Sequence, residues 1–207
     1  MWTDWQVSTE NVRFIPSTDL EPSGKSTLIS ALLRLLETQS GTITIDWIDI
    51  STIPLDVLRT HIIAIPQDTF LLPGSIRFNL DPTSRSTDTV LIAALEKTNL
   101  LSLTTSRGGL DAELTSTSLS QGEQRLFALA VALVRKWNRD HDGCNCGGIL
   151  VLDEPTSGTD AVTDALMQKV IDDVFGRYTV LHVSHRPDMV KGADRVIEME
   201  NGRVVRG

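Results

Sequence analysis

Cysteine, positive charge and long apolar runs are all scarce in this chain. The 207 residues include two cysteines, Cys144 and Cys146, which lie too close together to staple a fold and therefore indicate a reducing compartment. The formal net charge is −8, so no nucleic-acid partner is expected. No apolar run approaches the roughly 20 residues of a membrane helix, and no secretory pattern follows Met1. The chain is long enough for one domain, or for one domain with a small subdomain.

Strand-like and helix-like segments alternate along the chain, which predicts an α/β fold with a largely parallel sheet. Strands are expected at 12–15, 42–46, 62–65, 149–152 and 179–183, with a terminal hairpin at 196–199 and 203–205. Helices are expected at 28–36, 55–59, 75–80, 88–99, 121–137 and 161–174. The first strand is the least regular, because Arg13 interrupts it and Pro16 ends it, whereas a buried parallel strand is normally an unbroken apolar run.

The stretch Leu119-Ser120-Gln121-Gly122-Glu123 opens the longest predicted helix. Ser120 stands at the cap position and Glu123 lies three residues on, which predicts a capping box whose two side chains satisfy backbone N–H groups at the helix start. One interpretation is therefore a well-capped core helix. The other uses the same physics, since a helix start with Ser and Gly presents free N–H groups and a partial positive charge to a phosphate.

A second candidate phosphate site is Gly24-Lys25-Ser26-Thr27, which lies directly before an apolar helix. Gly24 lets the backbone approach the phosphates, Lys25 neutralises the charge of the β- and γ-phosphates, and the Ser26 hydroxyl can hold Mg²⁺. By itself the pattern is also typical of an ordinary helix start.

Polar side chains follow three of the predicted strands. Asp153 and Glu154 end an apolar strand, at the point where α/β folds bind ligands, which suits Asp153 to Mg²⁺ and Glu154 to polarising the attacking water. Gln67 follows a second strand and can contact Mg²⁺ and that water, and His185 follows a third and can donate to a γ-phosphate oxygen. Taken singly, each has a plain alternative: solvated carboxylates, a loop glutamine and a structural histidine.

Together and in this order, these signals resemble the nucleotide-binding domain of an ATP-binding-cassette transporter. They are the stretch 24–27, Gln67, the signature motif 119–123, the stretch 149–154 and His185. The segment Pro73-Gly-Ser-Ile-Arg-Phe-Asn-Leu-Asp-Pro82 is most similar to the second such domain of the multidrug-resistance-associated (C) subfamily of exporters, and Glu154 fits a hydrolysis-competent second domain.

The resemblance implies a P-loop NTPase core with a mostly parallel sheet and a helical signature subdomain at about 75–137, with the N-terminal antiparallel strands largely missing. An atypical segment would occupy 1–18 and the nucleotide-binding domain 19–207. The implied activity is ATP hydrolysis with Mg²⁺ that powers export through a membrane. The domain would lie on the cytoplasmic side as part of a transporter, and the isolated chain would be soluble.

The resemblance also implies partners and site residues. ATP would lie in a head-to-tail sandwich with a second nucleotide-binding domain, while transmembrane domains would sit on a separate or missing segment. The catalytic residues would be Glu154, His185 and Gln67, and the Mg²⁺ ligands would be Ser26, Gln67 and Asp153. The nucleotide-binding residues would be Ser23, Gly24, Lys25, Ser26 and Thr27 for this domain's ATP, and Ser120, Gln121, Gly122 and Glu123 for the partner's. Residues 157–160 would form the D-loop.

The chain departs from the family pattern G-x-x-G-x-G-K-[ST] at 19–26, where Asp19 and Pro22 replace two glycines. Pro22 has no N–H to give a phosphate oxygen, and losing one charge-assisted hydrogen bond of roughly 1.5–3 kcal/mol predicts ATP binding about tenfold weaker or more. Asp19 and Glu21 add repulsion. Trp47 stands where the family usually has a turn glycine, and the segment before Asp19 is too short to supply the aromatic that stacks on adenine, for which Trp2 or Trp5 would be poor substitutes.

Other hypotheses remain open from the sequence. A fragment or altered gene product explains the departures, and a degenerate cassette that binds nucleotide weakly without turnover is the first alternative function. A soluble cassette ATPase of DNA repair or translation is the second, although the acidic charge and the segment 73–82 count against it. His141, Cys144 and Cys146 lack the usual zinc spacing. Arg135, Lys136 and Arg139 are expected to form a solvated face.

Overall fold

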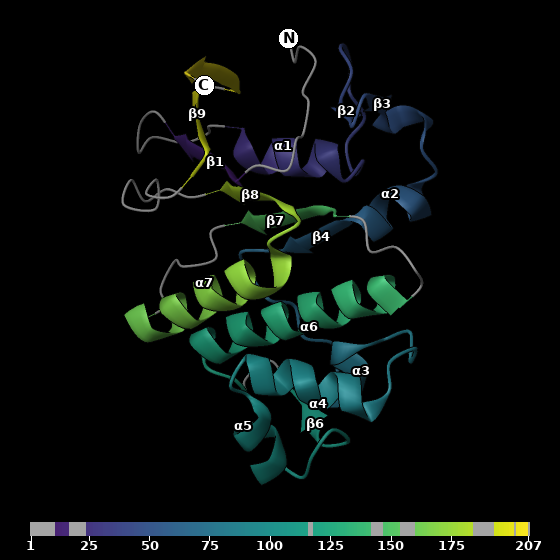
Figure 1. Ribbon diagram of the computed structural model, residues 1–207, viewed down its shortest axis with the longest axis vertical. Helices are drawn as coiled ribbons and strands as arrows, with labels where there is room; N and C mark the ends of the chain where they lie inside the picture. Colours follow the sequence, from purple (N-terminus) through teal and green to yellow (C-terminus); the bar gives the residue numbers. More distant parts are fainter. Residues whose placement is uncertain are drawn as a thin grey trace. The chain divides into compact units, whose positions relative to one another are not determined.

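The computed structural model describes residues 11–16, 24–115, 118–141, 147–153, 160–183, 193–200 and 202–206 (Figure 1). The chain divides into two compact units. The first unit comprises Met1–Ala64, Gly147–Glu154 and Arg177–Gly207, and the second comprises Ile65–Cys146 and Pro155–Gly176. Each unit has its own packed interior.

The first unit is built around a mostly parallel sheet. Its elements are β1 (Asn11–Pro16), α1 (Lys25–Leu32), β2 (Thr44–Ile45), β3 (Ile48–Asp49), η1 (Ile50–Thr52), α2 (Leu55–His61), β4 (Ile62–Ile65), β7 (Ile149–Asp153), β8 (Thr179–Val183), β9 (Arg195–Glu200) and β10 (Arg203–Arg206). Six strands form one sheet in the order β10-β9-β1-β8-β7-β4. Strand β1 pairs in parallel with both β8 and β9, β7 pairs in parallel with β8, and β10 returns antiparallel to β9. The predicted α/β fold is confirmed.

Strand β1 lies inside this sheet in spite of its interrupted sequence. Its neighbours are β8, with Phe14 opposite Val183, and β9, with Pro16 opposite Met199. Pro16 is the last residue of the strand, so its missing N–H removes a donor only at the end of the ladder. A parallel strand can therefore form at 11–16 although Arg13 breaks the apolar run.

Helix α1 packs on the sheet of the first unit through Leu28, Ile29 and Leu32, which join one apolar cluster with residues of β7, β8 and β9 (Figure 1). The helix is shorter than the predicted 28–36. It ends at Leu32, because Arg34 adopts the left-handed conformation with φ 49°. The Arg34 guanidinium then donates to the carbonyl oxygens of Ile50 (3.0 Å) and Ile53 (2.6 Å). These bonds tie the end of the helix to the η1 segment.

The predicted strand 42–46 is reduced to a two-residue arm of a hairpin. Strands β2 and β3 pair antiparallel, with Ile45 opposite Ile48, and Asp46 and Trp47 form the turn between them. Both turn residues have positive φ, at 50° and 69°, which is the pattern of a type I′ turn. Glycine suits the second position of such a turn, so the Trp47 departure falls on a position where a side chain is strained.

The second unit is mainly helical. Its elements are β5 (Gly74–Ser75), α3 (Ile76–Leu80), α4 (Asp88–Lys97), α5 (Leu101–Ser106), β6 (Glu113–Leu114), α6 (Gln121–His141) and α7 (Ala161–Phe175). Helix α6 packs against α4 and α7, and its buried face includes Leu126, Leu129 and Leu133 (Figure 1). The sequence predicted α3, α4, α6 and α7, with α6 four residues longer than expected. It did not predict α5 or β6.

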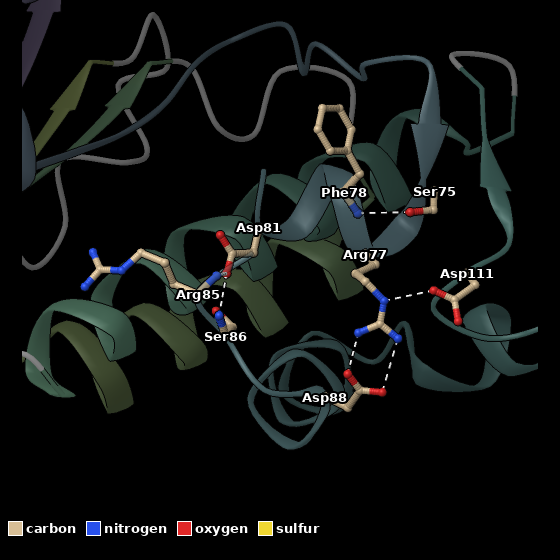
Figure 2. A network of polar contacts seen from close by, with 8 residues as sticks. All are labelled: Ser75, Arg77, Phe78, Asp81, Arg85, Ser86, Asp88 and Asp111. Atoms are coloured by element: carbon tan, nitrogen blue, oxygen red, sulfur yellow. Dashed lines mark hydrogen bonds and ion pairs between the residues drawn. The ribbon is translucent and has the colours of Figure 1, made fainter. Parts of the chain in front are cut away.

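A polar network fixes the start of the helical region in the second unit (Figure 2). The Arg77 guanidinium binds both carboxylate oxygens of Asp88 and also Asp111, at 2.8 Å. The pKa of Arg77 is raised by its hydrogen bonds to Asp88 and Asp111. These contacts join α3 to the first residue of α4 and to the loop before β6.

Candidate functional site

The first unit brings the ends of its parallel strands to one edge of the sheet. Val183 ends β8 and lies opposite Phe14 on one side and Asp153 on the other. Asp153, which is half-buried, is the last residue of β7, as the sequence predicted. Ligands of open α/β sheets bind outside the carboxyl ends of the strands, so Asp153 stands where a ligand would be reached.

The start of α1 lies at the same edge. Gly24 caps the helix with φ 84° and ψ 6°, and its carbonyl accepts the first helical bond from Leu28 N–H at 3.0 Å. A Cβ on Gly24 would stand 2.8 Å from the Cα of Gly202, in the turn that follows β9. Only glycine satisfies both the left-handed conformation and this close approach.

The first turn of α1 has the chemistry of an anion site. It carries no acidic residue and no side-chain cap, and the side chains of Ser26 and Thr27 are exposed. The N–H groups of a first helical turn have no acceptor within the helix and lie at the positive end of its dipole. A phosphate fits this arrangement.

Several predicted site residues lie outside the described residues. They are Ser23, Glu154 and His185, together with the substituted positions Asp19 and Pro22 and the D-loop residues 157–159. Lys25 is the first residue of α1. The roles of Lys25 and of the residues outside the described range stay predictions.

Gln67 belongs to the second unit, where it is exposed on the loop after β4. Two residues further on, the Thr69 hydroxyl donates to the carbonyl of Gln124 in α6 at 3.2 Å. This bond attaches the loop of Gln67 to the first turn of the signature helix. Spacing alone gave no sign of this link, because a lone threonine in a loop carries no specific signal.

The predicted capping box at the start of α6 is confirmed. The Ser120 N–H donates to the Glu123 carboxylate at 2.7 Å, and the Glu123 N–H donates to the Ser120 hydroxyl at 3.3 Å. Ser120 and Gln121 are exposed, and Gly122 lies beside Thr163 of α7. The N–H groups of Gln121 and Gly122 have no acceptor within the helix, so the same start is capped and still offers donors to an anion.

Asp160, the last residue of the predicted D-loop, caps α7. Its carboxylate accepts from the N–H groups of Val162 and Thr163, both at 2.9 Å. The hydrogen bond from the Thr163 backbone is the main cause that lowers the pKa of Asp160. The carboxylate therefore stays ionised and marks where α7 begins.

The basic residues of α6 correct one expectation. Arg135 is exposed, but Arg139 is buried, and Lys136 forms a 2.5 Å ion pair with Asp140. The predicted solvated face is therefore wrong for Arg139, because α6 turns that position toward the interior of its unit. His141 ends the helix, whereas Cys144 and Cys146 lie outside the described residues.

The described part of the chain has neither a cluster of metal-ligating side chains nor a membrane-spanning helix. No group of three or more His, Cys, Asp or Glu side chains there could hold a metal ion. No helix there is both long and apolar enough to cross a bilayer.

Comparison with known proteins identifies the family. Residues 21–157 match the ABC transporter family model. The chain is 40% identical over 183 residues to the ABC multidrug transporter B of Aspergillus fumigatus, covering 88% of this chain and 12% of that protein. It is 44% identical over 195 residues to the ABC-type transporter braE of Annulohypoxylon truncatum, with 88% and 13% covered. It is 40% identical over 185 residues to the mouse (Mus musculus) ATP-binding cassette sub-family C member 10, with 88% and 12% covered.

The chain thus spans about an eighth of the length of these relatives, at 12–13% of each. The family match at 21–157 includes four of the five motif signals, all except His185, and the comparisons do not favour a soluble cassette ATPase of another class. With the parallel sheet and the start of α1 at its carboxyl edge, they support the P-loop NTPase core. The chain belongs to the ABC transporter family, the ATP-binding-cassette proteins, as its motifs predicted.

Proposed function

We propose that this chain is the ATP-binding and ATP-hydrolysing domain of a membrane transporter. One observation of the first unit carries the proposal. The start of α1 at Gly24, which has no side-chain cap, and Asp153 both lie at the carboxyl edge of one parallel sheet. A donor-rich helix start suits the phosphates, and a carboxylate nearby suits their metal ion.

The predicted site residues would have separate roles. The first-turn N–H groups of α1 and the amine of Lys25 bind the phosphates and offset their charge. Mg²⁺, when bound, would neutralise charge on the β- and γ-phosphates, and Ser26, Gln67 and Asp153 are the residues suited to hold it. Glu154 would orient and polarise the attacking water and take up its proton.

The remaining predicted residues complete the proposal. Gln67 would contact the metal and the attacking water, and His185 would donate to a γ-phosphate oxygen. The exposed start of α6, with Ser120, Gln121, Gly122 and Glu123, would bind the nucleotide of a second nucleotide-binding domain arranged head to tail. Its N–H groups and the positive end of a 21-residue helix support this role.

The relatives suggest what the whole protein does. Their names include a multidrug transporter and a sub-family C member. These names support assignment to the C subfamily of exporters and, with the segment 73–82, to its second nucleotide-binding domain. Transmembrane domains elsewhere in the whole protein would then be driven by closure and opening of the ATP sandwich, with this domain on the cytoplasmic side.

Replacing Glu154 by Gln tests the catalytic assignment. Gln keeps the size of the side chain but cannot accept the proton of the attacking water, so turnover should be abolished while ATP binding is preserved. Glu96→Gln, on the exposed face of α4, is the matched control and should hydrolyse ATP at the wild-type rate. Unchanged turnover in Glu154→Gln would remove Glu154 from this role. A wild-type protein that binds ATP weakly without hydrolysing it would support the degenerate cassette instead.

A further inference from the structure

Residues 118–120, here called the signature loop, lie just before α6, and two side chains hold the backbone of this loop. The Arg107 guanidinium donates to the carbonyl of Ser118, and the Gln124 amide donates to the carbonyl of Leu119 at 3.0 Å. Arg107 caps the end of α5, whereas Gln124 lies in the first turn of α6. Donors from two helices thus hold consecutive carbonyl groups of one loop.

The surroundings of the loop add to this restraint. The Ser118 hydroxyl accepts the Thr115 N–H at 3.0 Å and lies 2.6 Å from the Thr115 hydroxyl. Arg107 lines a small, mostly apolar cavity together with Leu114 and Leu119, and Leu119 is buried. Arg107 therefore reaches the loop through its guanidinium and borders the same cavity as the loop residue Leu119.

Holding these carbonyl groups matters for an anion. A carbonyl oxygen that faces a phosphate repels it, whereas an N–H group attracts it. With the oxygens of Ser118 and Leu119 engaged by Arg107 and Gln124, the loop cannot turn them toward the helix start without losing hydrogen bonds. The N–H groups of Gln121 and Gly122 then remain the groups that an approaching anion meets.

We propose that Arg107 is a positioning residue for the signature loop: together with Gln124 it fixes the loop so that the start of α6 is preorganised for the triphosphate held by the partner domain. Arg107 would act on the nucleotide indirectly, through its bond to the carbonyl of Ser118. The proposal rests on the proposed function, because it assumes that the start of α6 binds a nucleotide phosphate.

The test compares the ATP affinity of the parent and of each variant in the full-length protein. All of them carry Glu154→Gln, which stops turnover. Arg107→Met keeps the stem and removes the donor, so we expect ATP affinity to fall about tenfold, the usual effect of losing one hydrogen bond from a charged group. Arg107→Lys keeps a cationic donor and should recover part of the loss. Arg135→Met, on the exposed face of α6, is the control and should bind ATP like the parent.

Thermal unfolding without nucleotide separates positioning from folding. We expect Arg107→Met and the Arg135→Met control to unfold within a few degrees of the parent, so that the affinity loss stands apart from stability. An affinity loss that lysine does not relieve, accompanied by a large drop in the unfolding midpoint, would overturn the positioning role. So would equal ATP affinity in Arg107→Met and Arg135→Met, and in that case the proposed function would stand.

A second variant covers the case in which Arg107→Met does not fold. Gln124→Met removes the donor to the neighbouring carbonyl without touching Arg107, and it should also weaken ATP binding several-fold. Parent-like affinity in Gln124→Met would then overturn the proposal. A parent protein that binds no ATP at all would overturn the proposed function and this inference together.

Discussion

Asp81 is a buried charged residue of the second unit, and the effect of its removal on the free energy of unfolding can be calculated from its pKa shift. It directly follows α3, is 5% exposed, and accepts hydrogen bonds from the N–H groups of Thr83 (3.0 Å), Arg85 (2.8 Å) and Ser86 (2.7 Å). Figure 2 shows Asp81 with Arg85 and Ser86. Burial acts to raise its pKa, but the hydrogen bonds from Thr83 and Ser86 together outweigh burial and lower the pKa from 3.8 to about 2. The carboxylate thus organises the loop between α3 and α4.

The pKa shift sets the size of the effect. Because each pKa unit is worth about 1.36 kcal/mol, the ionised Asp81 contributes roughly 2 kcal/mol to stability at pH 7. Asp81→Asn keeps the shape but loses the charge and places an NH₂ group among N–H donors, so the unfolding midpoint should fall by roughly 4–8 °C. Asp68→Asn, an exposed loop position, is the control and should leave the midpoint unchanged.

The pH dependence gives a second check on the same residue. A lowered pKa stabilises the fold fully above the unfolded value near 4, and this contribution is lost as the pH falls from about 4 to 2. The stability difference between wild type and Asp81→Asn should therefore shrink to about half at pH 3. Thermal unfolding followed by circular dichroism at pH 7 and pH 3 measures both quantities. Equal midpoints for Asp81→Asn and Asp68→Asn at pH 7 would refute the reasoning.

Two further substitutions test the hairpin turn and the signature helix. Trp47→Gly should stabilise the chain by about 0.5–1 kcal/mol, because it relieves a left-handed side chain that is 80% exposed, whereas Trp47→Ala keeps the strain; a glycine variant no more stable than the alanine variant in thermal unfolding would contradict this. Ser120→Ala should destabilise the chain by about 1 kcal/mol, because it removes one of the two hydrogen bonds of the capping box. Ser102→Ala on the exposed face of α5 is its control, and equal unfolding midpoints would argue against a capping role.

Periodicity predicted the elements whose residues all favour one structure. The strand 149–152 is an unbroken apolar run, and the helix from Gln121 has both a capping box and apolar residues at helical spacing, so local and tertiary preferences agree. The carboxyl edge of the sheet could be predicted for the same reason. Asp153 could be placed at this edge because its apolar strand ends there.

The elements that were missed depend on contacts that spacing does not reveal. Helix α5 consists of Leu101–Ser106, a segment rich in Ser and Thr, and its hydroxyl groups bond back to backbone carbonyls within the helix. Helix α1 ends earlier than predicted, and the Arg34 guanidinium just beyond it donates hydrogen bonds to carbonyl oxygens 16 and 19 residues away. Arg107 acts across 11 residues on Ser118. Such long-range partners of arginine leave no periodic signal in the sequence.

ATP affinity, measured by calorimetry with and without Mg²⁺, tests most directly whether the carboxyl edge of the sheet and the start of α1 form a nucleotide site. We predict weak binding that Mg²⁺ tightens, that Lys25→Ala abolishes, and that Pro22→Gly improves about tenfold by restoring an N–H donor. An ATP affinity that neither Mg²⁺ nor the two substitutions change would contradict the account. So would the absence of binding at millimolar ATP.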